Sequence, residues 1–276
     1  MTRSRKLREA TGAVSSPAVP EPRSPEGAPG AATTPELSLI LPCRNEEEVL
    51  GSTLEVVDRF LARRGHSYEI LVSDDSSTDG TAGVAAEYAR RNLGVRVVPA
   101  AAERGKGAAL SRGFAAAHGQ WAAFLDADLE IPVENLSSLL KALEEGADIA
   151  IGSKRIGSDS KRRSSIRRLI TAGYAAWVRI WLGSRLSDHQ AGAKALRLDR
   201  CRSVLERIRS TGWSWDTEML VYAQQEGLRI TECPITTRPT NRASRVHVLR
   251  DPLRMAWEVV RLRTRGVRVG PTARTG

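Results

Sequence analysis

Apolar and polar residues follow a regular pattern between positions 37 and 153, where short apolar runs alternate with longer segments of helical spacing. Each apolar run has the length of one β-strand, and the five runs are LSLILP, YEILVS, VRVVPA, WAAFLDA and ADIAIGS. The intervening segments predict helices at 46–65, 77–91, 105–119 and 132–146. Strands that are apolar on both faces are typical of a parallel sheet covered on both sides. The pattern predicts an α/β fold with a Rossmann-like, mostly parallel central sheet and helices on both faces.

The rhythm changes after residue 152, where a basic loop leads into a predicted helix at 165–183. The segments that follow are AGAKALRL, a helix near 199–208, WDTEMLVYAQQEG, a strand LRITECPI and a helical pattern at 251–265. Residues 1–35 are rich in Pro, Ala, Ser and Thr without apolar periodicity, which predicts a disordered tail. We therefore expect one folded domain over 36–248 and a basic amphipathic C-terminal segment over 249–276.

The formal net charge of +10 is distributed unevenly. Residues 153–185 and 238–276 each carry a net charge of +8, so the body of the chain is acidic. Such basic blocks attract phosphates, nucleic acid or an anionic membrane surface. No apolar run approaches the roughly 20 residues that span a bilayer, and the N-terminus lacks the apolar core of a signal peptide. The sequence predicts a cytoplasmic protein without a transmembrane helix.

Three acids at alternate positions, Asp126, Asp128 and Glu130, end the apolar run WAAFLDADLE. In a parallel α/β sheet the ligand lies beyond the carboxyl ends of the strands, where Asp126 and Asp128 are expected. Hard divalent cations prefer oxygen ligands, so we predict that this pair binds Mg²⁺ or Mn²⁺ with a substrate diphosphate. Glu130 is either a further metal ligand or a solvated acid.

Polar residues also follow two other predicted strands. Asp75 ends the second strand and could accept hydrogen bonds from a base or ribose, whereas Asp79 is expected to cap the next helix. The first strand ends with Pro42, Arg44, Asn45 and Glu46. Three polar strand ends of one sheet define a single site.

Basic residues surround these acids in the sequence. The segment ERGKG opens a predicted helix with Lys106, and free N–H groups at a helix start favour a phosphate. Lys154 and Arg167 follow the fifth strand and could grip a diphosphate or a phosphorylated acceptor, with Arg245 closing over it. The alternative for each is a solvated surface charge.

Asp216 and Glu218 begin the predicted helix in GWSWDTEML. Acids at this position suit the helix dipole. Alternatively they lie on the acceptor side of the site, where Asp216 could act as a general base.

Together these stretches resemble the family 2 glycosyltransferases with the GT-A fold, and most of all the dolichyl- and polyprenyl-phosphate sugar synthases. The resemblance runs over residues 36–250 and rests on LILPCRNEEE, EILVSDDSSTDGT, RGKGAALSRGFAAAHG, FLDADLEIP, AIGSKR, DHQAGAKAL and GWSWDTEML. The last two are closer to the glucosyl-phosphate than to the mannosyl-phosphate lipid synthases. The resemblance implies a GT-A nucleotide-diphospho-sugar transferase fold, a UDP-glucose or GDP-mannose type of donor, and a polyprenyl or dolichyl phosphate acceptor.

The resemblance also implies roles for individual residues. The nucleotide pocket would be lined by Pro42, Arg44, Glu46, Ser73 and Asp75. The sugar diphosphate would meet Asp126, Ala127 and Asp128, with Asp128 and Glu130 on the metal. Phosphates would contact Lys154, Arg167 and Arg245. Ser76 departs from the family, because glycine is common at its position.

A lipid monophosphate is largely dianionic near neutral pH and can attack without a general base, inverting the anomeric centre. A hydroxyl acceptor, the second enzymatic interpretation, would require a base, for which Asp216 is the candidate. Nucleic-acid binding is disfavoured because no recognised motif accompanies the charge. The 165–183 and 249–265 segments mix Trp, Leu and Arg, which suits a helix on an anionic membrane surface or ordinary core packing.

Overall fold

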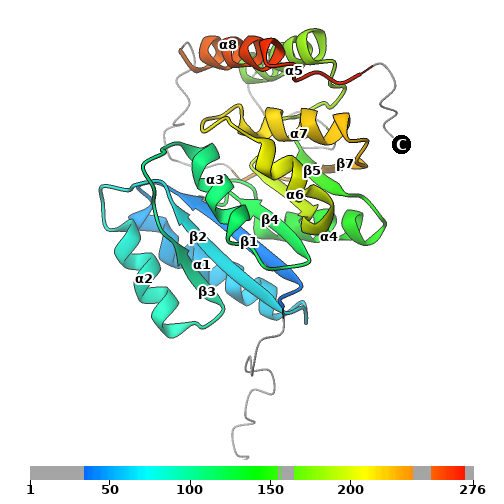
Figure 1. Cartoon of the computed structure of the whole chain (residues 1–276). Coiled ribbons are helices and arrows are strands. Elements are labelled where there is room, and N and C mark those ends of the chain that lie inside the picture. Colours follow the sequence, from blue (N-terminus) through cyan, green and yellow to red (C-terminus); the bar gives the residue numbers. More distant parts are fainter. Residues whose placement is uncertain (1–33, 155, 157–164, 239–249, 271–276) are drawn as a thin grey trace, which may run out of the picture. The chain divides into compact units, whose positions relative to one another are not determined.

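The computed structural model describes residues 34–154, 156, 165–238 and 250–270 (Figure 1). Within these residues a seven-stranded sheet has the strand order β3-β2-β1-β4-β6-β5-β7. The strands are β1 (Leu37–Cys43), β2 (Tyr68–Asp74), β3 (Val95–Val98), β4 (Trp121–Leu125), β5 (Ile149–Ser153), β6 (Ala193–Arg197) and β7 (Ile230–Pro234). Strand β6 is antiparallel to both of its neighbours, and the other pairings are parallel. The predicted mostly parallel sheet is confirmed.

Helices connect the strands and cover both faces of the sheet (Figure 1). They are α1 (Glu47–Ala62), α2 (Thr81–Arg91), α3 (Lys106–Ala115), α4 (Leu136–Glu144), α5 (Ser165–Leu182), α6 (Leu198–Arg207), α7 (Trp215–Gln225) and α8 (Arg250–Thr264). A 3₁₀ turn, η1 (Val133–Asn135), precedes α4 where the sequence predicted one continuous helix from 132. The turn follows Pro132, whose ring fixes φ and removes an N–H donor.

Two apolar clusters lie on opposite faces of the sheet because successive strand residues point in opposite directions. Leu39 and Ala123 face a cluster with α1, α2 and α4, whereas their neighbours Ile40 and Phe124 face α3, α6 and α7. Both faces of β1 and β4 are therefore buried, which explains why their sequences are apolar throughout.

A third cluster joins α5 and α8, which lie side by side (Figure 1), to α7. Val178 of α5 and Val259 of α8 are fully buried in it, and Trp177 Nε1 donates to the Ala256 carbonyl at 3.1 Å. The opposite surfaces of these helices remain open, since Ile180 is 76% and Trp257 63% exposed. The amphipathic pattern thus serves core packing on one side while leaving large apolar side chains in solvent on the other.

No helix in the described part of the chain is both long and apolar enough to cross a membrane. The predicted tail falls almost entirely on residues 1–33, which lie outside the described residues, as does Arg245. Arg167 belongs to α5, but its side chain is outside the description as well.

Candidate active site

The carboxyl ends of β2, β1 and β4 lie side by side because these strands are neighbours and parallel. Pro42 pairs with Ser73 and Cys43 with Asp74, so the polar segments that follow begin at the same level. The Asp75 N–H continues the pairing by donating to the Cys43 carbonyl at 2.8 Å. The structure thereby brings together the three polar strand ends that the sequence singled out.

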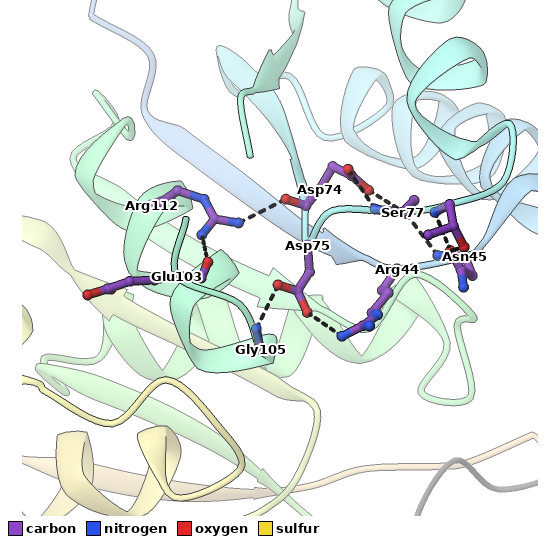
Figure 2. Close-up of polar contacts among 9 residues, drawn as sticks. Arg44, Asn45, Asp74, Asp75, Ser77, Glu103, Gly105 and Arg112 are labelled. Atoms are coloured by element: carbon purple, nitrogen blue, oxygen red, sulfur yellow. Dashed lines mark hydrogen bonds and ion pairs between the residues drawn. The ribbon is translucent and has the colours of Figure 1, made fainter. Parts of the chain in front are cut away.

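Asp75 is the centre of the first part of this site (Figure 2). Its buried carboxylate accepts a hydrogen bond from the Gly105 N–H at 2.7 Å and lies 3.4 Å from the half-exposed Arg44 guanidinium. Gly105 has φ 118°, and a Cβ there would collide with the Thr211 carbonyl. Only glycine lets the start of α3 approach both Asp75 and the loop at 211–214.

Arg112 and Asn45 fix the loops around Asp75 (Figure 2). The Arg112 guanidinium donates to the Asp74 carbonyl at 2.8 Å and to the Glu103 carbonyl at 3.1 Å. The Asn45 backbone donates to Ser77 Oγ, and its side-chain oxygen accepts from the Thr78 N–H at 2.8 Å. Two residues here, Asn45 at φ 52° and Ser76 at φ 55°, adopt the left-handed region that favours glycine. The loop therefore holds Ser76 in a conformation where glycine would be less strained.

Other predicted nucleotide-site residues make structural contacts. Ser73 is buried and donates to the Ala109 carbonyl at 2.7 Å, which ties β2 to α3. The backbone of Glu46 donates to Thr81 Oγ1, and its carbonyl accepts the Leu50 amide of α1. Their roles toward a nucleotide stay predictions.

Asp79 was expected to cap α2; it lies one residue before the N-cap, Gly80, and accepts the first amide of the helix. Its carboxylate accepts the Thr81 N–H at 3.0 Å and the Glu47 N–H at 3.3 Å, while Glu47 accepts the Gly80 N–H at 2.8 Å. The hydrogen bond from the Thr81 hydroxyl is the main reason that the pKa of Asp79 is lowered. The two helix starts thus satisfy each other's orphan amides.

The second part of the site contains the three acids after β4. Asp126 Oδ1 lies 2.5 Å from Lys106 Nζ, and Glu130 Oε1 lies 3.0 Å from Lys154 Nζ. Asp128 is exposed, and its carboxylate accepts the Glu130 N–H at 3.0 Å across Leu129, which has φ 47°. Ala127 lies between Asp126 and Asp128 in the chain, and its carbonyl accepts a hydrogen bond from the Thr53 hydroxyl at 2.7 Å. Each acid therefore has its own partner.

Lys106 lies between the acids and two aromatic rings. Its Nζ is 5.6 Å from the Phe124 ring centre and 5.4 Å from that of Trp213. Burial opposes the charge, but the carboxylates of Asp126, Asp216 and Asp128 outweigh it and raise the pKa of Lys106. Lys106 is thus held as a cation against the acids.

Gly192, which the sequence reasoning missed, packs directly against the carboxyl group of Asp126. Its carbonyl accepts the Asp126 N–H at 3.2 Å, and a Cβ on Gly192 would lie 2.6 Å from Asp126 Cγ. The segment DHQAG that carries it is the connection into β6. Gly192 and Asp126 are far apart in the sequence and meet only in the folded chain, so the sequence pattern does not reveal this contact.

A buried ion pair of Lys194 and Asp216 holds the segment that contains Gly192. Both side chains are almost fully buried, and the Lys194 ammonium lies 2.6 Å from Asp216 Oδ1 and donates to the Ala191 carbonyl at 2.7 Å. It also lies 5.2 Å from the Phe124 ring centre. The lysine inside the apolar segment AGAKALRL was the signal for it.

Glu218 fixes the loop against which α3 begins. Its fully buried carboxylate accepts the N–H groups of Arg209 at 3.2 Å and Ser210 at 2.8 Å. The same loop accepts the Ala108 amide at Thr211. Asp216 and Glu218 thus both support the site from the first turn of α7.

The acids suit a metal only together with a ligand. Among the described residues no group of three or more His, Cys, Asp or Glu side chains could hold a metal ion by itself. Asp128 and Asp126 nevertheless offer hard oxygen donors at one edge, and Mg²⁺ is commonly held by one or two carboxylates plus substrate phosphates. The residues present fit a divalent cation shared with a diphosphate.

Comparisons with known proteins identify the relatives of this chain. The Glycosyl transferase family 2 description matches residues 38–204. Glycosyltransferase AglD of Haloferax volcanii is 32% identical over 87% of the chain, which spans only 39% of AglD. Dolichyl-phosphate beta-glucosyltransferase of Dictyostelium discoideum is 27% identical over 83% of the chain and 74% of that protein. Undecaprenyl-phosphate mannosyltransferase of Micrococcus luteus is 32% identical over 71% of the chain and 81% of that protein.

The solved structures share the fold. Glucosyl-3-phosphoglycerate synthase from Mycobacterium tuberculosis in complex with uridine-diphosphate superposes with a TM-score of 0.64 at 22% identity, covering 86% of this chain and 82% of the other. The same enzyme with Mn²⁺, uridine-diphosphate-glucose and phosphoglyceric acid gives a TM-score of 0.61 at 24% identity, covering 84% and 80%. At these identities the likeness concerns the fold alone.

Proposed function

The chain belongs to glycosyl transferase family 2 and has the GT-A fold, and on this premise we propose that it transfers a hexose from a nucleotide-sugar to a polyprenyl phosphate. Family membership makes it a glycosyltransferase. The acceptor class is supported by the names of its relatives, which act on dolichyl or undecaprenyl phosphate. Several relatives are named glucosyltransferases and others mannosyltransferases; we propose UDP-glucose as the donor, because the segments DHQAGAKAL and GWSWDTEML are closer to the glucosyl type.

One observation carries the proposal: consecutive residues at the start of α3 bind the acids of two different strand ends. Gly105 donates to Asp75 after β2, and Lys106 pairs with Asp126 after β4. A nucleotide-sugar has the same two-part character, with a nucleoside at one end and a charged diphosphate at the other. We assign the nucleoside to Asp75 and Arg44, and the diphosphate to Lys106 and the acids after β4.

Asp126, Asp128 and Glu130 would hold Mg²⁺ or Mn²⁺ in this assignment. When bound, such an ion supplies positive charge that stabilises the departing nucleoside diphosphate. Lys106 contributes a second positive charge from the protein itself, and its raised pKa keeps it protonated. Gly192 packs against the carboxyl group of Asp126, and the Asp128 carboxylate accepts the Glu130 N–H.

The transfer is a single displacement. A phosphate oxygen of the acceptor forms a bond to the anomeric carbon while the bond from that carbon to the diphosphate oxygen breaks. The electron pair leaves with the nucleoside diphosphate, no proton needs to move, and the anomeric centre inverts. The net positive charge of residues 153–185, which begin at the end of β5, favours the approach of an anionic acceptor to an anionic donor.

Asp216 serves this reaction as a support rather than as a base. Its carboxylate is buried and paired with Lys194 at 2.6 Å, so withdrawing it would leave an unpaired lysine inside the protein. A phosphate nucleophile requires no base, in agreement with this pairing. Transfer to a hydroxyl, which needs one, is the alternative outcome of the test.

In this proposal the surface formed by α5 and α8 binds the membrane that carries the lipid acceptor. The exposed Ile180 and Trp257 lie on helices that also carry Arg254, Arg261 and Arg263. Apolar side chains among arginines bind the boundary of an anionic bilayer. We therefore place the protein peripherally on the cytoplasmic face of a membrane.

A radiolabelled transfer assay tests the proposal. Purified protein with Mg²⁺ or Mn²⁺ and a short polyprenyl phosphate is offered UDP-glucose and GDP-mannose in parallel, with Asp128→Ala as the control. We expect label from UDP-glucose in the lipid phase, lost in the control. Label that stays in the aqueous phase with both donors contradicts the proposal.

A further inference from the structure

Each of the two outer acids after β4 is paired with a lysine from a different element. Lys106 opens α3 and reaches Asp126 at 2.5 Å, whereas Lys154 follows β5 and reaches Glu130 at 3.0 Å. Both lysines are largely buried, with side chains 18% and 14% exposed. These pairs are therefore better shielded from water than ordinary surface salt bridges.

The pairs occupy carboxylate oxygens that a divalent cation would use. A cation approaching Asp126 Oδ1 meets an ammonium 2.5 Å away, and one approaching Glu130 Oε1 meets another at 3.0 Å. Like charges at such separations repel strongly where water is scarce. Without a further anion, the metal must compete with both lysines.

A diphosphate changes this balance. It brings several anionic oxygens to the same edge, and lysine ammonium groups are well suited to phosphate as compact point charges. When the lysines pair with the phosphates instead, the carboxylates lose their cationic partners. The metal becomes the partner that restores neutrality.

We propose that Lys106 and Lys154 are exchangeable counter-ions: without the donor they neutralise Asp126 and Glu130 and keep the divalent metal out, and on donor binding they transfer to its diphosphate. Metal and donor then bind with positive cooperativity. The inference rests on the proposed function, because it takes the donor to be a nucleoside-diphosphate sugar.

The chain contains an internal contrast to these exchangeable pairs. Lys194 and Asp216 form a pair of similar length, 2.6 Å, but the lysine is fully buried and also bonded to the Ala191 carbonyl. That pair has no access to a ligand and stays in place. The Lys106 side chain is instead 18% exposed, so its ammonium remains accessible to a ligand.

Direct measurement of Mn²⁺ binding tests the proposal without any transfer reaction. The free Mn²⁺ signal is followed by electron paramagnetic resonance, with and without saturating UDP or GDP and corrected by titrations that contain no protein. The variants are Lys106→Met and Lys154→Met. Lys141→Met is the matched control, because Lys141 pairs with Glu145 at 3.7 Å on the open surface.

In the wild type we expect one of the nucleotides to raise Mn²⁺ affinity roughly tenfold or more, within the usual range of coupling between sites. Lys106→Met should bind Mn²⁺ several-fold tighter than wild type in the absence of nucleotide and lose most of the nucleotide-dependent gain. Lys154→Met should do the same to a smaller extent. Lys106→Arg, which keeps the charge, should resemble the wild type, as should Lys141→Met.

The inference is overturned if neither nucleotide changes Mn²⁺ affinity in the wild type, or if Lys106→Met binds Mn²⁺ no tighter than wild type without nucleotide. Thermal unfolding checks that each variant is folded. The proposed function fails separately: a protein that shows the exchange but moves no sugar to lipid phosphate refutes the acceptor and leaves the counter-ions intact.

Discussion

Gly192 lies so close to Asp126 that an alanine at this position should displace the carboxylate. An added Cβ would be 2.6 Å from Asp126 Cγ and closer still to Oδ2, whereas ordinary contacts are 3.4–4 Å. Gly192 does not have a positive φ, so the backbone itself accepts alanine. The strain therefore falls on the Asp126 side chain.

The size of the effect follows from these distances. The carboxyl group must retreat by about 1 Å, and a misplacement of about 1 Å in a catalytic group can cost roughly 100-fold in rate. Turning the side chain off its rotamer costs about 0.5–1.5 kcal/mol, which the protein can tolerate because Asp126 is partly exposed. Gly192→Ala should stay folded and still lose most of its activity.

Steady-state transfer from the nucleotide-sugar to polyprenyl phosphate measures the loss, and thermal unfolding measures stability. Gly83→Ala is the matched control, since a Cβ on Gly83 has nothing within 4 Å. We expect kcat/KM to fall about 100-fold in Gly192→Ala with a small change in Tm, and neither to fall in the control. If the rate of Gly192→Ala is within a few-fold of the wild-type rate, transfer does not depend on the present position of the Asp126 carboxyl group.

The remaining predictions concern other parts of the same region. Asp128→Asn should abolish transfer without lowering Tm, because Asp128 is exposed; an active variant would remove it from the donor site. Lys194→Met should destabilise the fold by about 3–5 kcal/mol in urea unfolding, since it leaves Asp216 buried and unpaired, and Lys194→Met with Asp216→Leu should recover part of this loss. Burial, aided by Lys194, lowers the pKa of His189 from 6.5 to about 3, so only the unfolded chain takes up the proton between these values. The free energy of unfolding should therefore fall by up to about 1.4 kcal/mol per pH unit as pH drops from 6.5 toward 3. His189→Gln should flatten this slope, and an unchanged slope would show that His189 is not buried as a neutral side chain.

The architecture was largely predictable because burial on both faces leaves a direct trace in the sequence. The apolar runs that became β1, β2 and β4 were recognised, and their polar ends meet as predicted. The predicted start of the helix at 132 was less accurate, because a 3₁₀ turn at Val133–Asn135 precedes α4. AGAKALRL was left unassigned, and its middle forms β6, whose antiparallel direction no local pattern specifies.

The candidate site was predictable in composition and less so in its contacts. The acids Asp75, Asp126 and Asp128 were found because charges at the ends of buried strands need an explanation. Gly192 and the pairing of Lys194 with Asp216 depend on segments far apart in the chain that meet only in the folded state. The same distance in sequence hides the partners that Lys106 and Lys154 select among the acids.

The most direct test of the account compares two acceptors that differ only in the attacking group. Purified protein with Mn²⁺ and labelled UDP-glucose is offered a short polyprenyl phosphate and the corresponding polyprenol, and the lipid phase is counted. The account predicts label in the phosphate lipid alone, with inverted anomeric configuration by NMR and no signal with Asp128→Asn. Label in the polyprenol, or in neither lipid, would contradict it, and label in the polyprenol would require a base near the acceptor.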